Sequence, residues 1–193
     1  MGEPGKIIVL NGASSSGKTS ILHALQDLLD EPYLEAGIDK FIFMLPPRYL
    51  ERPLWDSVLG LATTAGVAGH RLFSGMHHAV AELARTGSSV LVDHVLVEPD
   101  WVHECAALFS GLPAYLVGVH CPLEVLEQRE AARPNRTPGQ ARAQFSLVHA
   151  HCVYDLFVDT SLLNPQECAI KIKERLENGI PPHAFELLNL KRL

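Results

Sequence analysis

Long apolar runs are missing from this chain of 193 residues. None approaches the ~20 residues that a membrane-spanning helix needs, which excludes a helical membrane protein and predicts no membrane partner. The first five residues also lack the basic segment and the following apolar stretch that mark a signal peptide. We therefore expect the protein to be cytoplasmic.

Positive charge is in short supply as well. The 16 Lys and Arg residues are outnumbered by 22 Asp and Glu residues, which gives a formal net charge of −6. Proteins that bind the phosphate backbone of nucleic acids need the opposite balance, so we expect no nucleic-acid partner and favour a small-molecule substrate. The 47% of apolar residues excludes a disordered chain, and the length predicts a single domain over residues 1–193.

Potential metal ligands are not arranged as a metal motif. The four cysteines are widely separated, which predicts reduced, buried thiols. They are Cys105, Cys121, Cys152 and Cys168. Histidines cluster at residues 77–78 and 149–151, but neither cluster matches a dedicated zinc motif. We expect these histidines to pack in the core or to lie on helix surfaces.

The chain is organised around a complete phosphate-binding P-loop. It lies between an aliphatic run at residues 7–10 and an amphipathic segment at residues 20–29, which is the strand, loop and helix setting that such a loop requires. Its residues are Gly12, Ala13, Ser14, Ser15, Ser16, Gly17, Lys18 and Thr19. The glycines let backbone N–H groups surround phosphate oxygens at a helix N-terminus. We expect Lys18 to reach the β- and γ-phosphates and Thr19 to bind magnesium, so the motif predicts ATP and Mg²⁺ as cofactors.

Strands and helices alternate along the rest of the chain. Aliphatic runs predict strands at residues 7–10, 33–38, 89–93, 114–119 and 155–159. Apolar residues at helical spacing predict helices at residues 20–29, 70–85, 99–109, 122–133, 140–151 and 165–176. This order predicts an α/β fold of the P-loop NTPase, kinase-like type, with a doubly wound, five-stranded parallel sheet and helices on both faces. Functional groups in such sheets lie at the carboxyl ends of the strands, where Asp39 and Asp93 stand.

Two further segments fall outside this alternation. Residues 41–69 mix apolar residues with Pro, Gly, Ala and Thr, and we interpret them as a substrate-covering insertion. The tail at residues 178–193 is apolar at several positions, so it packs either on the body of the protein or on a neighbouring copy in a homo-oligomer.

An arginine-rich loop occupies residues 129–139. It carries Arg129, Arg133 and Arg136 around Pro and Gly residues, which is typical of a kinase lid. The guanidinium group suits this role because it is always charged and can contact two phosphate oxygens at once. The alternative is a solvated basic helix end.

Together these segments resemble the chloramphenicol phosphotransferase-like family of P-loop kinases. The match spans roughly residues 6–176 and rests on residues 11–19, 37–39, 90–93, 117–121 and 158–160 and on the arginine-rich loop. In that family ATP phosphorylates a hydroxyl of a small molecule, and the resemblance implies that Asp39 is the base that takes the hydroxyl proton. A helix N-cap is the alternative role for Asp39.

One departure concerns the strand that ends at Asp93. Where strands of the family often end in two acidic residues, this chain has Asp93 followed by His94. Asp93 alone then remains as the magnesium partner, and a purely structural role is the alternative for it. His94 becomes a candidate to contact substrate. The acceptor-side residues after Asp39 are poorly matched, so the resemblance does not identify the acceptor.

The leading hypothesis is an ATP-dependent O-phosphotransferase acting on a small hydroxylated molecule, with chloramphenicol or a related antibiotic and resistance by inactivation suggested by the resemblance. The candidate catalytic residues are Asp39, Lys18, Arg133 and Arg136. Thr19 and Asp93 are the candidate metal ligands, and Arg129 joins the P-loop in nucleotide binding. One alternative is a sugar or nucleoside kinase. The other is a nucleotide-dependent switch or ATPase module, although the chain has no guanine-selecting Asn-Lys-x-Asp segment.

Overall fold

A computed structural model describes residues 2–51, 59–60, 64–133 and 139–190. Its main sheet has five strands in the order β2-β5-β1-β6-β7, and every pair of neighbours is parallel. The strands are β1 (Ile7–Asn11), β2 (Tyr33–Glu35), β5 (Ser89–His94), β6 (Ala114–His120) and β7 (Leu156–Asp159). This arrangement confirms the predicted fold class.

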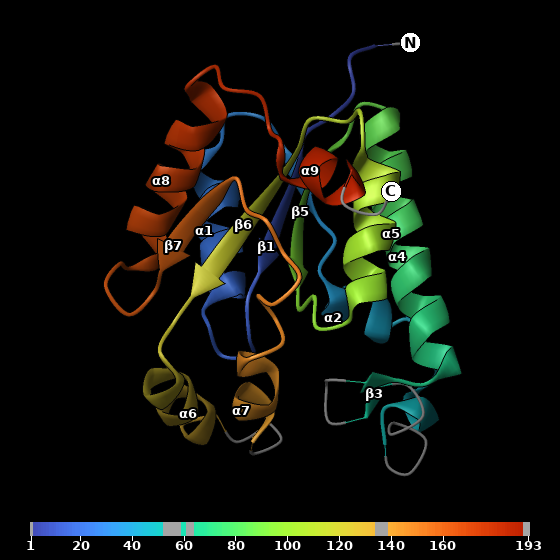
Figure 1. Ribbon diagram of the computed structural model, residues 1–193, viewed down its shortest axis with the longest axis vertical. Helices are drawn as coiled ribbons and strands as arrows, with labels where there is room; N and C mark the ends of the chain where they lie inside the picture. Colours follow the sequence, from blue (N-terminus) through green and yellow to red (C-terminus); the bar gives the residue numbers. More distant parts are fainter. Residues whose placement is uncertain (1, 52–58, 61–63, 134–138, 191–193) are drawn as a thin grey trace.

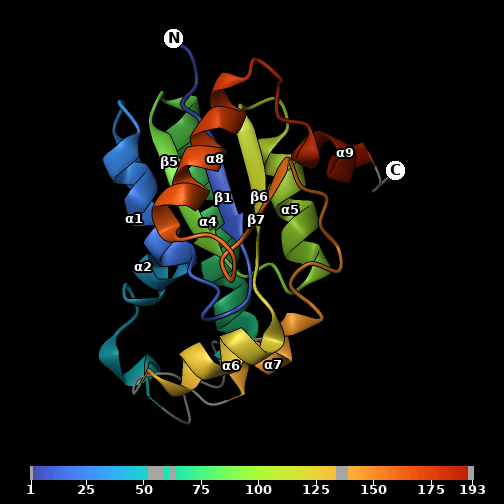
Figure 2. The ribbon, with the colours of Figure 1, turned by 90° about the vertical axis from the view of Figure 1, so that its left-hand side faces the viewer.

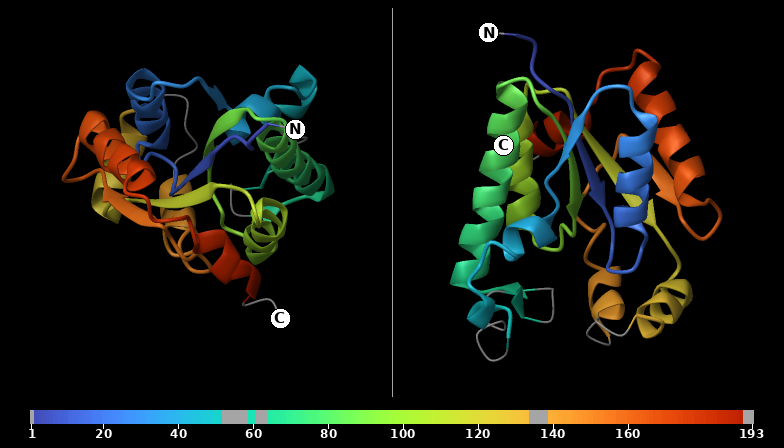
Figure 3. Two further views of the ribbon diagram at one scale, coloured as in Figure 1. Left: turned by 90° about the horizontal axis from the view of Figure 1, so that it is seen from above. Right: turned by 180° about the vertical axis from the view of Figure 1, so that it is seen from behind.

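Helices cover both faces of the sheet (Figures 1 and 3). One face carries α1 (Lys18–Leu28) and α8 (Pro165–Glu177), and the other carries α4 (Val67–Arg85) and α5 (Pro99–Phe109). Because side chains alternate along a strand, the central strand β1 contributes Ile7 and Val9 to one core and Ile8 and Leu10 to the other. In the described part of the chain, no helix is both long and apolar enough to cross a membrane.

Several short elements gather at and beyond the carboxyl edge of the sheet, in the lower half of Figures 1 and 2. They are the helices α2 (Ile38–Ile42), α6 (Leu123–Ala131) and α7 (Gln140–Phe145), the 3-10 helix η1 (Pro47–Tyr49) and the antiparallel pair of β3 (Leu59–Gly60) and β4 (Thr64–Ala65). The P-loop leaves β1 at the same edge, so these elements surround the place where nucleotide is expected.

The structure corrects three predicted boundaries. The second strand ends at Glu35 instead of residue 38, because the chain turns at Gly37 into α2. Helix α4 begins at Val67, so the last residues of the predicted insertion belong to it. Helix α7 ends at Phe145 rather than at residue 151, and the chain continues in turns with hydrogen bonds such as that from the Ala150 N–H to the Leu147 carbonyl. The pair β3–β4 inside the insertion was not predicted.

The C-terminal tail packs on the body of the protein. It forms α9 (Ala184–Leu190), which contacts α5 and β6. Phe185 and Leu188 are buried, and the Phe185 ring meets the edge of Phe109 with 5.2 Å between ring centroids. Of the two arrangements expected for the tail, the structure has the one in which it completes the core.

Candidate active site

The P-loop conformation depends on its two glycines. A Cβ atom at Gly12 would stand 2.5 Å from the Val119 carbonyl oxygen, so the strand β6 leaves no room for a side chain there. Gly17 caps α1 with a φ of 91°, in the left-handed region that favours glycine. The loop therefore passes close to β6 and then turns sharply into the N-terminus of α1. This geometry presents backbone N–H groups and the helix dipole to an anion.

Three predicted functional side chains meet at this loop. The Thr19 hydroxyl donates to Asp93 Oδ2 at 2.7 Å, and Lys18 Nζ lies 3.6 Å from Asp93 Oδ1. Lys18 Nζ also donates to the Ala13 carbonyl oxygen at 2.9 Å. Asp93 reaches them from β5, which lies beside β1 in the sheet. A cation, a hydroxyl and a carboxylate thus converge at the carboxyl edge, as a phosphate and its metal require.

The serine hydroxyls of the loop fit an anion with several acceptor oxygens. Ser14, Ser15 and Ser16 are buried, and among the described residues their Oγ atoms have no hydrogen-bond partner. Buried polar atoms are nearly always paired, because an unpaired one costs about 1–3 kcal/mol. Three adjacent unsatisfied donors are accounted for by a ligand rich in acceptor oxygens, such as a polyphosphate.

Asp39 lies at the same edge, in the first turn of α2. Its position follows from Gly37, where a Cβ atom would come within 3.1 Å of Asp93 Cβ. The Asp39 side chain is exposed and therefore open to a ligand. The N-cap alternative for Asp39 is wrong, because Gly37 occupies the N-cap position of α2. The placement leaves the acceptor-side base as the prediction for Asp39.

The three lid arginines fall in different settings. Arg129 in α6 donates to the Thr160 carbonyl oxygen at 2.7 Å and to Thr160 Oγ1 at 3.0 Å. Thr160 Oγ1 in turn donates to the Ser16 carbonyl oxygen at 2.8 Å, so Arg129 reaches the P-loop through Thr160. Arg133 follows α6 and is exposed. Arg136 lies outside the described residues.

Sequence reasoning missed two polar residues that attach α7 and the chain just after it to the P-loop and to the end of β1. Gln144 is 1% exposed and accepts a hydrogen bond from the Ser14 N–H at 2.7 Å. Asn11 is fully buried and donates to the Val148 carbonyl oxygen at 2.7 Å. A polar residue at the end of an apolar strand was a signal that could have singled out Asn11. Nothing in the local pattern distinguishes Gln144 from a surface glutamine.

His94 is not at the open edge, contrary to its expected contact with substrate. It is 1% exposed, and the Val95 N–H donates to its Nδ1 at 2.7 Å. Its proton is therefore on Nε2, which lies 2.8 Å from His77 Nε2. His77 Nδ1 then donates to Glu104 Oε2 at 2.6 Å. Burial, with neighbouring His77, holds the pKa of His94 well below its ordinary value, which fits this neutral chain.

Cys105 completes a buried group with these histidines, in which the potential ligand atoms of Cys105, His77 and His94 lie within 4.8 Å of one another. Burial raises the pKa of the Cys105 thiol well above its ordinary value, which favours the protonated form. His94 Nε2 already carries a proton, so hydrogen bonding accounts for the arrangement of the two histidines. The packing role predicted for His77 agrees with this arrangement.

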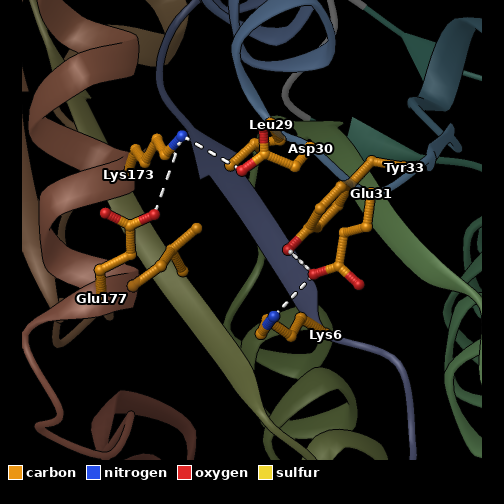
Figure 4. Close-up of a pocket in the computed structure, with 8 residues that line it drawn as sticks. Lys6, Leu29, Asp30, Glu31, Tyr33, Lys173 and Glu177 are labelled. Carbon is orange, nitrogen blue, oxygen red and sulfur yellow. Dashed lines mark hydrogen bonds and ion pairs between the residues drawn. The ribbon is translucent and has the colours of Figure 1, made fainter.

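A separate pocket of about 230 Å³ lies at the amino edge of the sheet, away from the P-loop (Figure 4). Its charged side chains are paired with one another. Lys6 Nζ lies 2.6 Å from Glu31 Oε1, and Lys173 Nζ lies 3.6 Å from Asp30 Oδ2. Ligands of open α/β sheets bind at the carboxyl edge, so this pocket is not the candidate active site.

Comparisons with known proteins agree with this geometry. The family described as Chloramphenicol phosphotransferase-like protein matches residues 5–177. A Mycobacterium tuberculosis protein named for a proposed O-phosphotransferase activity is 35% identical over 202 residues, which cover 98% of this chain and 90% of that protein.

Solved structures share the fold at lower identity. The M. tuberculosis APS kinase CysC, in complex with AMPPNP and APS, has a TM-score of 0.68 at 20% identity and covers 91% of this chain and 99% of its own. A sugar kinase from Janibacter sp. has a TM-score of 0.68 at 17% identity, with 91% and 96% covered. The family match over residues 5–177 and the 35% identical relative show that the chain belongs to the chloramphenicol phosphotransferase-like family of kinase-like O-phosphotransferases.

Proposed function

We propose that this protein is an ATP-dependent kinase that transfers the γ-phosphoryl group to a hydroxyl of a small molecule. The observation that carries the proposal is the meeting of Lys18, Thr19 and Asp93 beside buried serine hydroxyls that have no partner in the described structure. Family membership supports phosphoryl transfer as the chemistry. The exposed Asp39 at the same edge supports an acceptor site next to the nucleotide.

Lys18 and the loop N–H groups would bind the β- and γ-phosphates and neutralise their charge. Asp39 would accept the proton of the acceptor hydroxyl. The hydroxyl oxygen would form a bond to the γ-phosphorus while the bond from that phosphorus to the leaving oxygen of ADP breaks. Arg133, and Arg136 beyond the described residues, would contact the transferring group from the arginine-rich loop. Arg129 would support the loop through Thr160 and Ser16.

Magnesium fits the donors at this site. The Thr19 hydroxyl and the Asp93 carboxylate are the oxygen ligands that Mg²⁺ prefers, and they lie 2.7 Å apart. These two side chains would hold the ion, directly or through water. When bound, Mg²⁺ supplies charge neutralisation for the phosphate oxygens.

Incubation with MgATP and a panel of hydroxylated compounds, including chloramphenicol, sugars and nucleosides, tests the proposal. Mass spectrometry should find a compound heavier by one phosphoryl group, and Lys18→Ala should abolish that product while keeping the fold. Nucleotide-dependent retention of a protein partner, with no phosphorylated compound from the panel, would instead favour the switch alternative.

A further inference from the structure

Helices α6 and α7 form one polar-linked unit. Glu130 of α6 is 7% exposed and accepts hydrogen bonds from the Gly139 and Ala141 N–H groups, both at 2.8 Å, at the start of α7. On the surface, Arg142 donates to both carboxylate oxygens of Glu127, at 2.7 and 3.0 Å. Because Glu130 satisfies two of the backbone donors that a helix start leaves unpaired, a shift of α7 would move α6 with it.

Helix α7 and the chain just after it contact the P-loop and the end of β1 at two points. Gln144 Oε1 accepts from the Ser14 N–H at 2.7 Å, and the Val148 carbonyl oxygen accepts from Asn11 Nδ2 at 2.7 Å. Residues 144 and 148 are linked by a helical hydrogen bond of 2.9 Å. The two contacted residues, Asn11 and Ser14, flank the first glycine of the loop. One turn of chain, from the end of α7 to Val148, therefore contacts both sides of the segment that the nucleotide must contact.

The Asn11–Val148 and Ser14–Gln144 contacts differ in whether nucleotide binding can move them. Asn11 belongs to β1, where each residue is buried between neighbouring strands, so the Val148 contact is fixed by the sheet. Ser14 belongs to the loop itself, next to the buried hydroxyls that have no partner among the described residues. The binding of phosphates to this loop would therefore change the position of Ser14 before that of Asn11. Gln144 of α7 contacts Ser14 directly.

We propose that Gln144 is a positioning residue that transmits occupancy of the P-loop to the α6–α7 unit, and through it to Arg129 and Arg133. The inference rests on the proposed nucleotide-binding function. The buried amide oxygen of Gln144 accepts the hydrogen bond of the Ser14 N–H. The other backbone donors of the loop then remain for the phosphate oxygens. Removal of this acceptor should weaken nucleotide binding by about tenfold and break the link to α6 and α7.

Hydrogen exchange measured by mass spectrometry tests the link, with a magnesium complex of a non-hydrolysable ATP analogue at saturation as the probe. In the wild-type protein the probe should slow exchange across residues 123–133 and 139–145. Gln144→Met, which keeps the length of the side chain without a strong acceptor, should lose that response although the probe is bound. Gln144→Glu keeps an acceptor oxygen and should keep the response, with weaker binding from its negative charge. Gln128→Met changes an exposed glutamine of α6 and is the matched control.

The outcomes distinguish a failure of the role of Gln144 from a failure of the proposed nucleotide-binding function. An unchanged response in Gln144→Met, or a wild-type protein that binds the probe without any change in α6 and α7, would overturn the role of Gln144. A wild-type protein that does not bind the probe would overturn the proposed function itself. If Gln144→Met fails to fold, Gln144→Asn replaces it in the same comparison, because the side chain of Asn is one methylene shorter and its amide oxygen lies farther from the Ser14 N–H.

Discussion

Replacement of Asp155 should destabilise the whole protein by detaching the C-terminal helix. The side chain is fully buried immediately before β7, where Oδ2 accepts from the Leu116 N–H at 2.9 Å and Oδ1 accepts from the His183 N–H at 2.8 Å. Arg175, 8% exposed, lies 3.5 Å from Oδ1. Asp155 therefore joins β6, α8 and the segment that leads into α9.

The magnitude follows from these partners. Asp155→Ala leaves the buried Leu116 N–H without an acceptor, a cost of about 1–3 kcal/mol. It also removes the carboxylate of a buried ion pair, for which losses of about 3–5 kcal/mol are typical. Arg175 keeps hydrogen bonds to the Ile180 and Pro181 carbonyl oxygens, so the two costs do not add fully. We expect a loss of about 3–4 kcal/mol, which corresponds to roughly 10 °C in the unfolding midpoint of a chain of this size.

Thermal unfolding followed by circular dichroism measures this loss, with Asp30→Ala as the matched control. Asp30 is 98% exposed and pairs with Lys173 at 3.6 Å, so its removal should cost less than about 1 kcal/mol. Asp155→Asn keeps one acceptor oxygen and should fall between the control and Asp155→Ala. An Asp155→Ala midpoint within about 2 °C of the wild type would refute the reasoning.

Three further expectations follow from the site and the core. Asp39→Asn should lower turnover by about 10²–10⁴ with ATP affinity nearly unchanged; calorimetry beside product formation decides this, and full turnover would remove Asp39 from the mechanism. Arg133→Ala should slow turnover by about 10², far more than it weakens ATP binding, whereas Arg85→Ala, at the far end of α4, should not; a loss confined to affinity would contradict the phosphate contact of Arg133. Urea unfolding should show stability falling as the pH drops from 7 to 5. Burial lowers the pKa of His94 well below 6.5 and that of His149 to about 4, so the unfolded chain takes up more protons in this range. The contribution of His94 to this slope approaches about 1.4 kcal/mol per pH unit below about pH 6, where the unfolded-state histidine is protonated, and a flat profile would count against its neutral, buried state.

The fold and the nucleotide end of the site follow from local pattern. An aliphatic strand, a glycine-bounded loop and an amphipathic helix occur within the first 29 residues, and each is specified by near neighbours. The meeting of Thr19 with Asp93 was predictable because the carboxyl ends of parallel strands share one edge of the sheet. An aspartate at the end of a predicted strand can therefore be placed at this edge from the sequence alone, before any tertiary contact is known.

The supports of the site depend on contacts between distant residues, which local pattern does not encode. Gln144 and Ser14 are 130 residues apart in the chain, and Asp155 meets His183 across 28 residues. The sequence made His94 a candidate to meet substrate, whereas alternation along β5 places it on the face opposite Asp93, against Phe73 of α4 and Trp101 of α5. The short second strand reflects the close approach of Gly37 to Asp93, a constraint that is visible only after the sheet has formed.

The central claim is that the carboxyl edge beside the P-loop holds ATP together with Mg²⁺ between Thr19 and Asp93. Calorimetric titration with ATP, with and without Mg²⁺, tests it most directly in the wild type, in Asp93→Asn and in the exposed control Asp27→Asn. Mg²⁺ should strengthen ATP binding to the wild type and the control, and that gain should be lost in Asp93→Asn. Absence of ATP binding to the wild type, or a gain from Mg²⁺ that survives in Asp93→Asn, would contradict the claim.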